Sequence, residues 1–125
     1  MAQVTTPHAG ENVAQLSLQL HFKANEYAEA ARTRAIAEAT YRAEKAKRIL
    51  RARADGEKSI AAATTVAEAD QFIAKCHLDY LIADGMVDAL TKSMIALRER
   101  IGVQRSVMAN EREADKLLAT SRELT

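Results

Sequence analysis

The hydrophobic pattern is most regular in the second half of the chain. From Val66 onward, apolar residues recur at alternating steps of three and four, which is the 3.5-residue repeat of a coiled-coil seam. The pattern predicts a long helix over about 66–109. Leu78, Leu81, Ile82 and Met86 widen the stripe, so several helices are expected to converge there. We expect core packing and oligomerisation along Val66, Ile73, Cys76, Tyr80, Val87, Leu90, Met94, Leu97 and Ile101.

The first half of the chain carries a weaker apolar stripe made mostly of alanine. It predicts a helix over about 24–55 that stops at Gly56, because glycine tolerates the left-handed conformation at a helix C-terminus. Residues 13–23 fit a strand by alternation and a helix by spacing, and both readings stay open. The predicted stripe consists of Tyr27, Ala31, Ala35, Ala39, Ala43, Ala46, Leu50 and Ala54.

These patterns define the expected organisation of the chain. Residues 1–12 form a flexible N-terminal tail, 13–113 a single helical domain with a connector over 56–65, and 114–125 a frayed C-terminal tail. The fold class is all-α, a long antiparallel helical hairpin with coiled-coil-like packing. Alanine is abundant and buries little area, so the core of one protomer would be thin. We therefore expect the hairpin to assemble into a homo-oligomer.

Positive charge is concentrated in one part of the predicted first helix. Residues 32–58 carry nine basic and four acidic side chains, a local charge of +5 in a chain whose net charge is +1. Such a local excess favours a polyanionic partner, most often nucleic acid. The candidate binding residues are Arg42, Lys45, Lys47, Arg48, Arg51, Arg53 and Lys58, with Tyr41 as a candidate for base stacking.

Internal neutralisation is the alternative explanation for this cluster. The second helix carries acidic residues that could pair with the basic helix in the folded protein, namely Glu68, Asp70, Asp79, Asp84 and Asp88. Against this, the densest basic run contains little acid at the three- or four-residue spacing of an internally paired helix.

The chain offers little for catalysis or for a cofactor. His8, His21 and His77 are scattered and lack partners at metal-ligand spacing, and Cys76 falls on the seam as a small hydrophobe. We find no phosphate loop and no nucleophile elbow, so we expect no enzyme, no metal and no cofactor. A single cysteine, no signal peptide and no membrane-spanning run predict a cytoplasmic protein that does not enter a membrane.

The end of the basic cluster carries a short motif. Leu50-Arg51-Ala52-Arg53-Ala54-Asp55 resembles the basic L-K-A-R-L-D element of the UvsY family of phage recombination mediators. The similarity extends over about 40–113, through Ala67-Glu68-Ala69-Asp70 and the small-residue stretch 85–90 to a basic segment around 98–112. Gly56 and Glu57 stand where the family has aromatic residues.

The resemblance implies a ring-like homo-oligomer that binds single-stranded DNA. Such a mediator helps to load a RecA-like recombinase onto DNA covered by single-strand-binding protein, in the cytoplasm of the host if the chain is phage-encoded. Arg and Lys would neutralise phosphates and give salt-sensitive, sequence-independent affinity. The alternative is a virion component, scaffold or host-defence inhibitor that forms a helical oligomer without binding nucleic acid.

Overall fold

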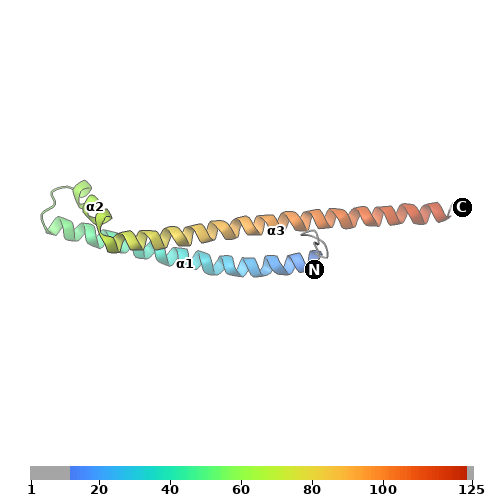
Figure 1. The fold of residues 1–125 in the computed structure, drawn as a ribbon, viewed down its shortest axis with the longest axis horizontal. Coiled ribbons are helices and arrows are strands. Elements are labelled where there is room, and N and C mark those ends of the chain that lie inside the picture. The colour runs from blue at the N-terminus through green and yellow to red at the C-terminus, as the bar shows by residue number, and fades with distance from the viewer. Residues whose placement is uncertain (1–11, 124–125) are drawn as a thin grey trace, which may run out of the picture. The chain divides into compact units, whose positions relative to one another are not determined.

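The computed structural model describes residues 12–123, and these residues are all-α. The helices are α1 (Val13–Ala54), α2 (Ile60–Ala69) and α3 (Gln71–Glu123), in that order (Figure 1). The chain divides into two compact units, residues 25–91 and residues 1–24 with 92–125. Within each unit a segment of α1 packs against an antiparallel segment of α3. This agrees with the predicted antiparallel helical hairpin.

Helix α1 begins at Val13, about eleven residues earlier than the pattern predicts. Asn12 caps it, since the Asn12 side chain accepts a hydrogen bond from the Gln15 backbone N–H at 2.8 Å. The Gln15 side chain in turn accepts one from the Asn12 N–H at 3.3 Å. This reciprocal arrangement is a capping box, and it satisfies two N–H groups that a helix start otherwise leaves unpaired. The predicted flexible tail over 1–12 otherwise lies outside the described residues.

Packing in the unit of residues 1–24 and 92–125 explains why residues 13–23 are helical. Leu16 is fully buried and clusters with Leu97 and Ile101 of α3, while Val13 and Leu20 pack against this cluster. Val13, Leu16 and Leu20 are three and four residues apart, so only a helix presents them together on one face. The strand reading of 13–23 is therefore wrong.

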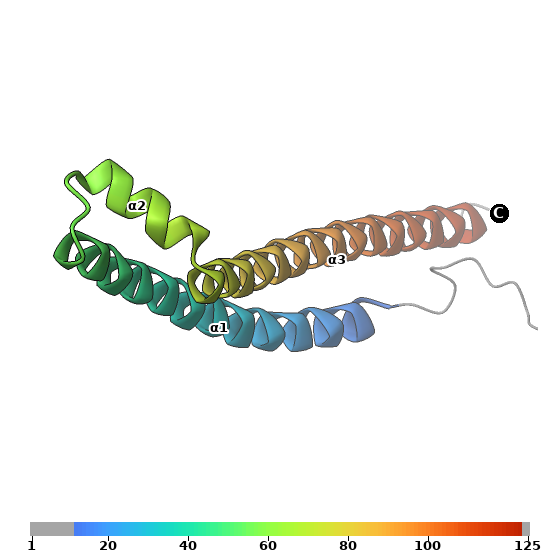
Figure 2. The same cartoon turned by 60° about the vertical axis from the view of Figure 1, so that its left-hand side comes forward.

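Helix α2 occupies most of the predicted connector. Ser59 is its N-cap and accepts a hydrogen bond from the Ala62 N–H at 3.1 Å. Ala63 and Ala67 of α2 and Ala52 of α1 are buried, and α2 lies beside the last turns of α1 (Figure 2). Alanine permits such a close approach of two helices because its side chain is a single methyl group.

A break at Asp70 separates α2 from α3. Its backbone is extended (φ −67°, ψ 129°), and its side chain accepts hydrogen bonds from Phe72 N at 2.9 Å and Ile73 N at 3.2 Å. Asp70 thus ends α2 and caps the start of α3. The continuous helix predicted from 66 is wrong at this point, and Val66 lies in α2, where it is half-buried.

The predicted seam is the buried face of α3. In the unit of residues 25–91, Tyr80 is half-buried, and in the other unit Met94 is half-buried. The remaining seam positions on α3 are buried: Ile73, Cys76, Val87 and Leu90 in the first unit, Leu97 and Ile101 in the second. Ala83, which has the same spacing, is buried with them. Helix α3 then continues to Glu123 where a frayed tail was expected over 114–125, because Ala, Leu, Lys, Glu and Arg favour helix.

The inner face of α1 differs from the predicted stripe. Between residues 25 and 54, Tyr27 and Ala31 are half-buried as expected, but the later stripe positions, Leu50 among them, are exposed. The face turned inward instead carries Arg34, Tyr41 and Arg48. Alanines occur on most sides of this helix, so their spacing does not single out one face. The larger side chains and the ion pairs decide the orientation.

Candidate nucleic-acid interface

The basic cluster ends at a turn with a recognisable pattern of backbone hydrogen bonds. Gly56 has φ +116°, Gly56 N–H bonds to Arg53 O at 3.2 Å, and Glu57 N–H bonds to Ala52 O at 3.0 Å. This is the Schellman arrangement, in which the left-handed residue is normally glycine. Arg51 and Arg53 therefore fall in the last turn of α1, and Lys58 lies just past the bend.

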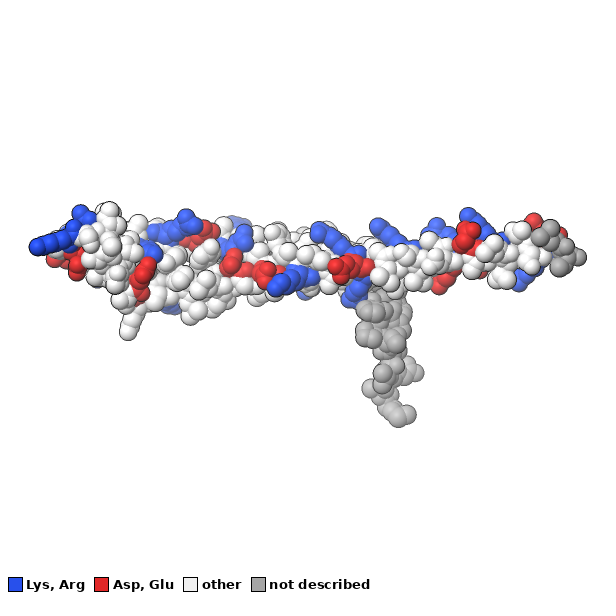
Figure 3. Space-filling model, turned by 90° about the horizontal axis from the view of Figure 1, so that it is seen from above, with Lys and Arg blue, Asp and Glu red and all other residues white. Residues whose placement is uncertain are grey.

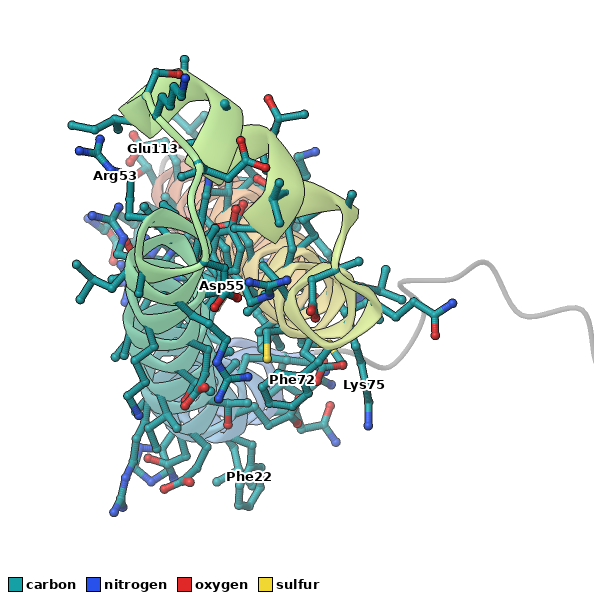
Figure 4. The ribbon with its side chains drawn as sticks, turned by 90° about the vertical axis from the view of Figure 1, so that its left-hand side faces the viewer. Phe22, Arg53, Asp55, Phe72, Lys75 and Glu113 are labelled. Carbon is teal, nitrogen blue, oxygen red and sulfur yellow. The ribbon has the colours of Figure 1, made fainter. Side chains whose placement is uncertain are left out.

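Three exposed cations of the cluster make no ion pair within residues 12–123, namely Arg51, Arg53 and Lys58. Figure 3 shows basic side chains projecting at the end of the 25–91 unit, where the chain turns from α1 into α2. Arg53 points outward from α1 in the view from that end (Figure 4). Asp55 and Glu57 share the turn, so the local positive charge is partly offset there.

Two further cations of the cluster form ion pairs within α1. Arg42 pairs with Glu38 at 2.8 Å and Lys47 with Glu44 at 3.3 Å, and the two basic side chains are 74% and 72% exposed. Exposed pairs of this kind contribute between about 0 and 1 kcal/mol. A phosphate can replace either glutamate at little cost, so Arg42 and Lys47 remain available to a polyanion.

Lys45 and Arg48 instead hold the helices of the 25–91 unit together. Lys45 pairs with Glu68 of α2 at 3.3 Å, and Arg48 pairs with Asp70 at 3.2 Å. Their side chains are only 25% and 26% exposed. Internal neutralisation therefore explains this part of the cluster, and it also applies to Arg34, which pairs with Asp84 at 3.5 Å.

Tyr41 is engaged within the protein. Its ring stacks on His77 at a centroid distance of 4.6 Å, and Tyr80 lies 6.3 Å away. Lys45 Nζ lies 5.5 Å from the Tyr41 ring centroid and donates a hydrogen bond to its hydroxyl at 3.4 Å. That hydrogen bond, and then the one to Glu68, raise the pKa of Lys45 above its ordinary value of 10.5. Tyr41 thus stabilises the helix pair and does not offer a free face to a base.

An exposed aromatic that the sequence pattern did not single out lies beside the cations. Phe72 is 57% exposed and lines an open hollow of about 300 Å³. Phe72 lies one residue off the seam, and its proximity to residues 44–51 depends on how α3 packs against α1. The sequence does place Phe72 directly before the seam residue Ile73, which indicates a ring turned away from the centre of the seam. The lining of the hollow is Glu44, Lys47, Arg48, Arg51, Asp70, Phe72 and Ile73.

Asp70 should make the stability of the 25–91 unit sensitive to acid. The Ile73 N–H, and after it Arg48, lower the pKa of Asp70 below its ordinary value of 3.8, against the opposing effect of burial. A lowered folded-state pKa stabilises the fold above the unfolded-state pKa, and this contribution disappears as the pH falls through the folded-state pKa. Asp70→Asn keeps a good N-cap but removes the carboxylate.

We expect wild type to exceed Asp70→Asn in stability at neutral pH, with the difference shrinking as the pH falls below the ordinary carboxyl pKa of 3.8 and disappearing once Asp70 is protonated in the folded state. Urea unfolding followed by circular dichroism at several pH values measures this difference. Asp79→Asn, which removes an exposed carboxylate from α3, the helix that Asp70 caps, is the matched control. A difference for Asp70→Asn that stays constant with pH would show that the ionised carboxylate is not responsible.

The described part of the chain contains no group of three or more His, Cys, Asp or Glu side chains that could hold a metal ion. Cys76 is buried on α3 as a free thiol. Among residues 12–123, no helix has an apolar stretch long enough to cross a membrane.

No family model, curated protein or solved structure matches the chain.

Proposed function

We propose that this chain is a non-enzymatic protein that binds single-stranded DNA through the turn between α1 and α2. The observation that carries the proposal is the exposed trio Arg51, Arg53 and Lys58, which lacks ion pairs within the described residues. Exposed Arg42 and Lys47 add positive charge along α1, Arg42 on the side of Arg53 and Lys47 on the side of Arg51. Exposed cations bind phosphates independently of sequence.

The proposed biological role is that of a recombination mediator. It rests on the resemblance of residues 50–55 to the UvsY family motif, whose two basic positions are Arg51 and Arg53. In this role a homo-oligomer would bind the strand, displace single-strand-binding protein and help to load a RecA-like recombinase. Assembly suits the chemistry, because a ring multiplies the modest affinity of each protomer through effective concentration.

A titration of the wild-type protein tests DNA binding directly. We expect labelled oligodeoxythymidine to show increased fluorescence anisotropy at about 50 mM salt and much weaker binding at about 200 mM. Three to five phosphate contacts per protomer correspond to a slope of about −2 to −3.5 in log K against log salt. No binding at the lower salt concentration would refute the proposal. Light scattering with and without the oligonucleotide gives the oligomeric mass.

A second function is favoured by a separate observation, the apolar surface between α1 and α3 in the 25–91 unit. Two adjoining hollows of about 260 and 290 Å³ share Thr33 and Asp79. Exposed Ile36, Ile82 and Met86 line them. Such a surface suits a helical structural or protein-interaction oligomer that does not bind nucleic acid. A stable oligomer without an oligonucleotide gel shift at low or moderate salt would favour this function.

A further inference from the structure

We propose that Phe72 is the stacking platform for one unpaired base of a strand whose adjacent phosphates contact Lys47 and Arg51. This inference rests on the proposed binding of nucleic acid. The added aromatic contact predicts a preference for single over double strands. Bases in a duplex are already stacked and are not available to an exposed ring.

The start of α3 fixes the position of the Phe72 ring. Asp70 accepts hydrogen bonds from the backbone N–H groups of Phe72 and Ile73, so the first turn of α3 is held in place. Ile73 is 3% exposed and points into the core. Neighbouring residues of a helix are rotated by about 100° about its axis, so the Phe72 side chain lies next to the buried seam and not within it. Figure 4 shows its ring on the side of α3 that adjoins α1.

The opposite wall of the hollow is one face of α1. Glu44, Lys47, Arg48 and Arg51 follow the three- and four-residue spacing that places side chains on a common helix face. Glu44 is paired with Lys47, and Asp70 with Arg48, so each carboxylate in the hollow is matched by a cation. Arg51 remains as the uncompensated positive charge. The hollow therefore combines a cation, a replaceable surface ion pair and an exposed aromatic.

This combination suits a nucleotide of a single strand. Binding without sequence preference requires cations that follow the phosphates and rings on which bases stack, and stacking on such rings is independent of base identity. The volume of about 300 Å³ lies at the lower end of the range for small-ligand pockets, which is appropriate for one base and its sugar. Phe72 thereby supplies the aromatic function that the residues directly after the 50–55 motif lack.

The substitution Phe72→Leu separates stacking from simple apolar contact. Leucine keeps an apolar side chain that can still pack against a protein partner, but it has no ring. We expect Phe72→Leu to weaken binding of oligodeoxythymidine by about tenfold. The salt slope should not change, because no charge is removed. The control is Phe22→Leu, which changes the other exposed phenylalanine, in the other unit, and should leave affinity unchanged.

Oligonucleotides with abasic sites provide an independent readout. Wild type should bind an abasic strand about tenfold more weakly than the intact strand, whereas Phe72→Leu should bind both equally. The chain has no tryptophan, so Phe72→Trp introduces its single tryptophan at the site. Its emission should be quenched by the intact strand and not by the abasic strand, and its affinity should be at least that of wild type.

The possible outcomes distinguish the two proposals. Equal binding of intact and abasic strands by wild type, with no loss in Phe72→Leu, would overturn the stacking role while DNA binding stands. A changed oligomeric mass of Phe72→Leu by light scattering, without the loss of base-dependent affinity, would assign Phe72 to a protein interface and also overturn it. Wild type that binds no oligonucleotide at low salt would refute both proposals. Circular dichroism melting checks that each variant folds as wild type does.

Discussion

Replacing Arg51 and Arg53 together by alanine is expected to weaken binding of single-stranded DNA by about tenfold and to reduce the salt slope by about 1.4. Both side chains are exposed, and neither makes an ion pair within residues 12–123. Their removal therefore takes away phosphate contacts without breaking contacts inside the protein. Loss of two cations from the last turn of α1 should cost the fold no more than about 1 kcal/mol for each side chain.

Two control variants identify the origin of the effect. Arg51→Lys with Arg53→Lys keeps both charges and should retain most of the affinity, since single strands are held largely by phosphate contacts. Arg105→Ala with Arg112→Ala removes the same net charge from α3 in the other unit and should change affinity little. Fluorescence anisotropy across a salt series measures all of them. An equal loss in the Arg105 and Arg112 variant would mean that net charge, and not this turn, governs binding.

Replacing Leu16 by alanine is expected to destabilise the packing of α1 on α3 in its own unit by about 2–5 kcal/mol. Leu16 is fully buried against Leu97 and Ile101, and no other side chain among the described residues is both large and fully buried. Its truncation removes apolar contact and leaves a cavity that a helix pair with so small a core cannot fill. Hydrogen exchange should show faster opening of the first turns of α1.

Leu18→Ala is the matched control for this prediction. Leu18 is the same residue type on the same helix but is 55% exposed, so its truncation should change stability by less than about 0.5 kcal/mol. Thermal unfolding and hydrogen exchange of the two variants give the comparison. Similar losses would contradict the assignment of Leu16, and not Leu18, to the core of this unit.

Helix boundaries were predictable where a single residue decides them. Gly56 marks the end of α1 from the sequence, because few other residues adopt its positive φ readily. The start at Asn12 was equally available, since Asn12 and Gln15 have the spacing of a capping box. Asp70 is different, because an Asp within a heptad pattern is compatible with an uninterrupted helix. Its pairing with Arg48, twenty-two residues earlier, depends on the folded arrangement.

The candidate binding site was predictable as a region but not residue by residue. Local charge density located the cluster, and Arg51, Arg53 and Lys58 are indeed exposed. Lys45, Arg48 and Tyr41 were grouped with them because the sequence does not show which side of α1 meets α2 and α3. In the structure Lys45 pairs with Glu68, Arg48 pairs with Asp70, and the Tyr41 ring stacks on His77. Phe72 joins the site only because α3 packs beside that face of α1.

The buried face of α3 follows from the amino-acid pattern alone, because mostly apolar side chains at a strict 3.5-residue spacing leave one energetically favourable orientation. The all-α class follows from it too, through abundant helix formers and few residues that break helices. The buried face of α1, in contrast, depends on the packing of the folded chain. Alanines on most sides of that helix differ little in the area they bury, so ion pairs and aromatic stacking with α2 and α3 select the orientation. That choice separates the cations that stabilise the fold from those that remain exposed.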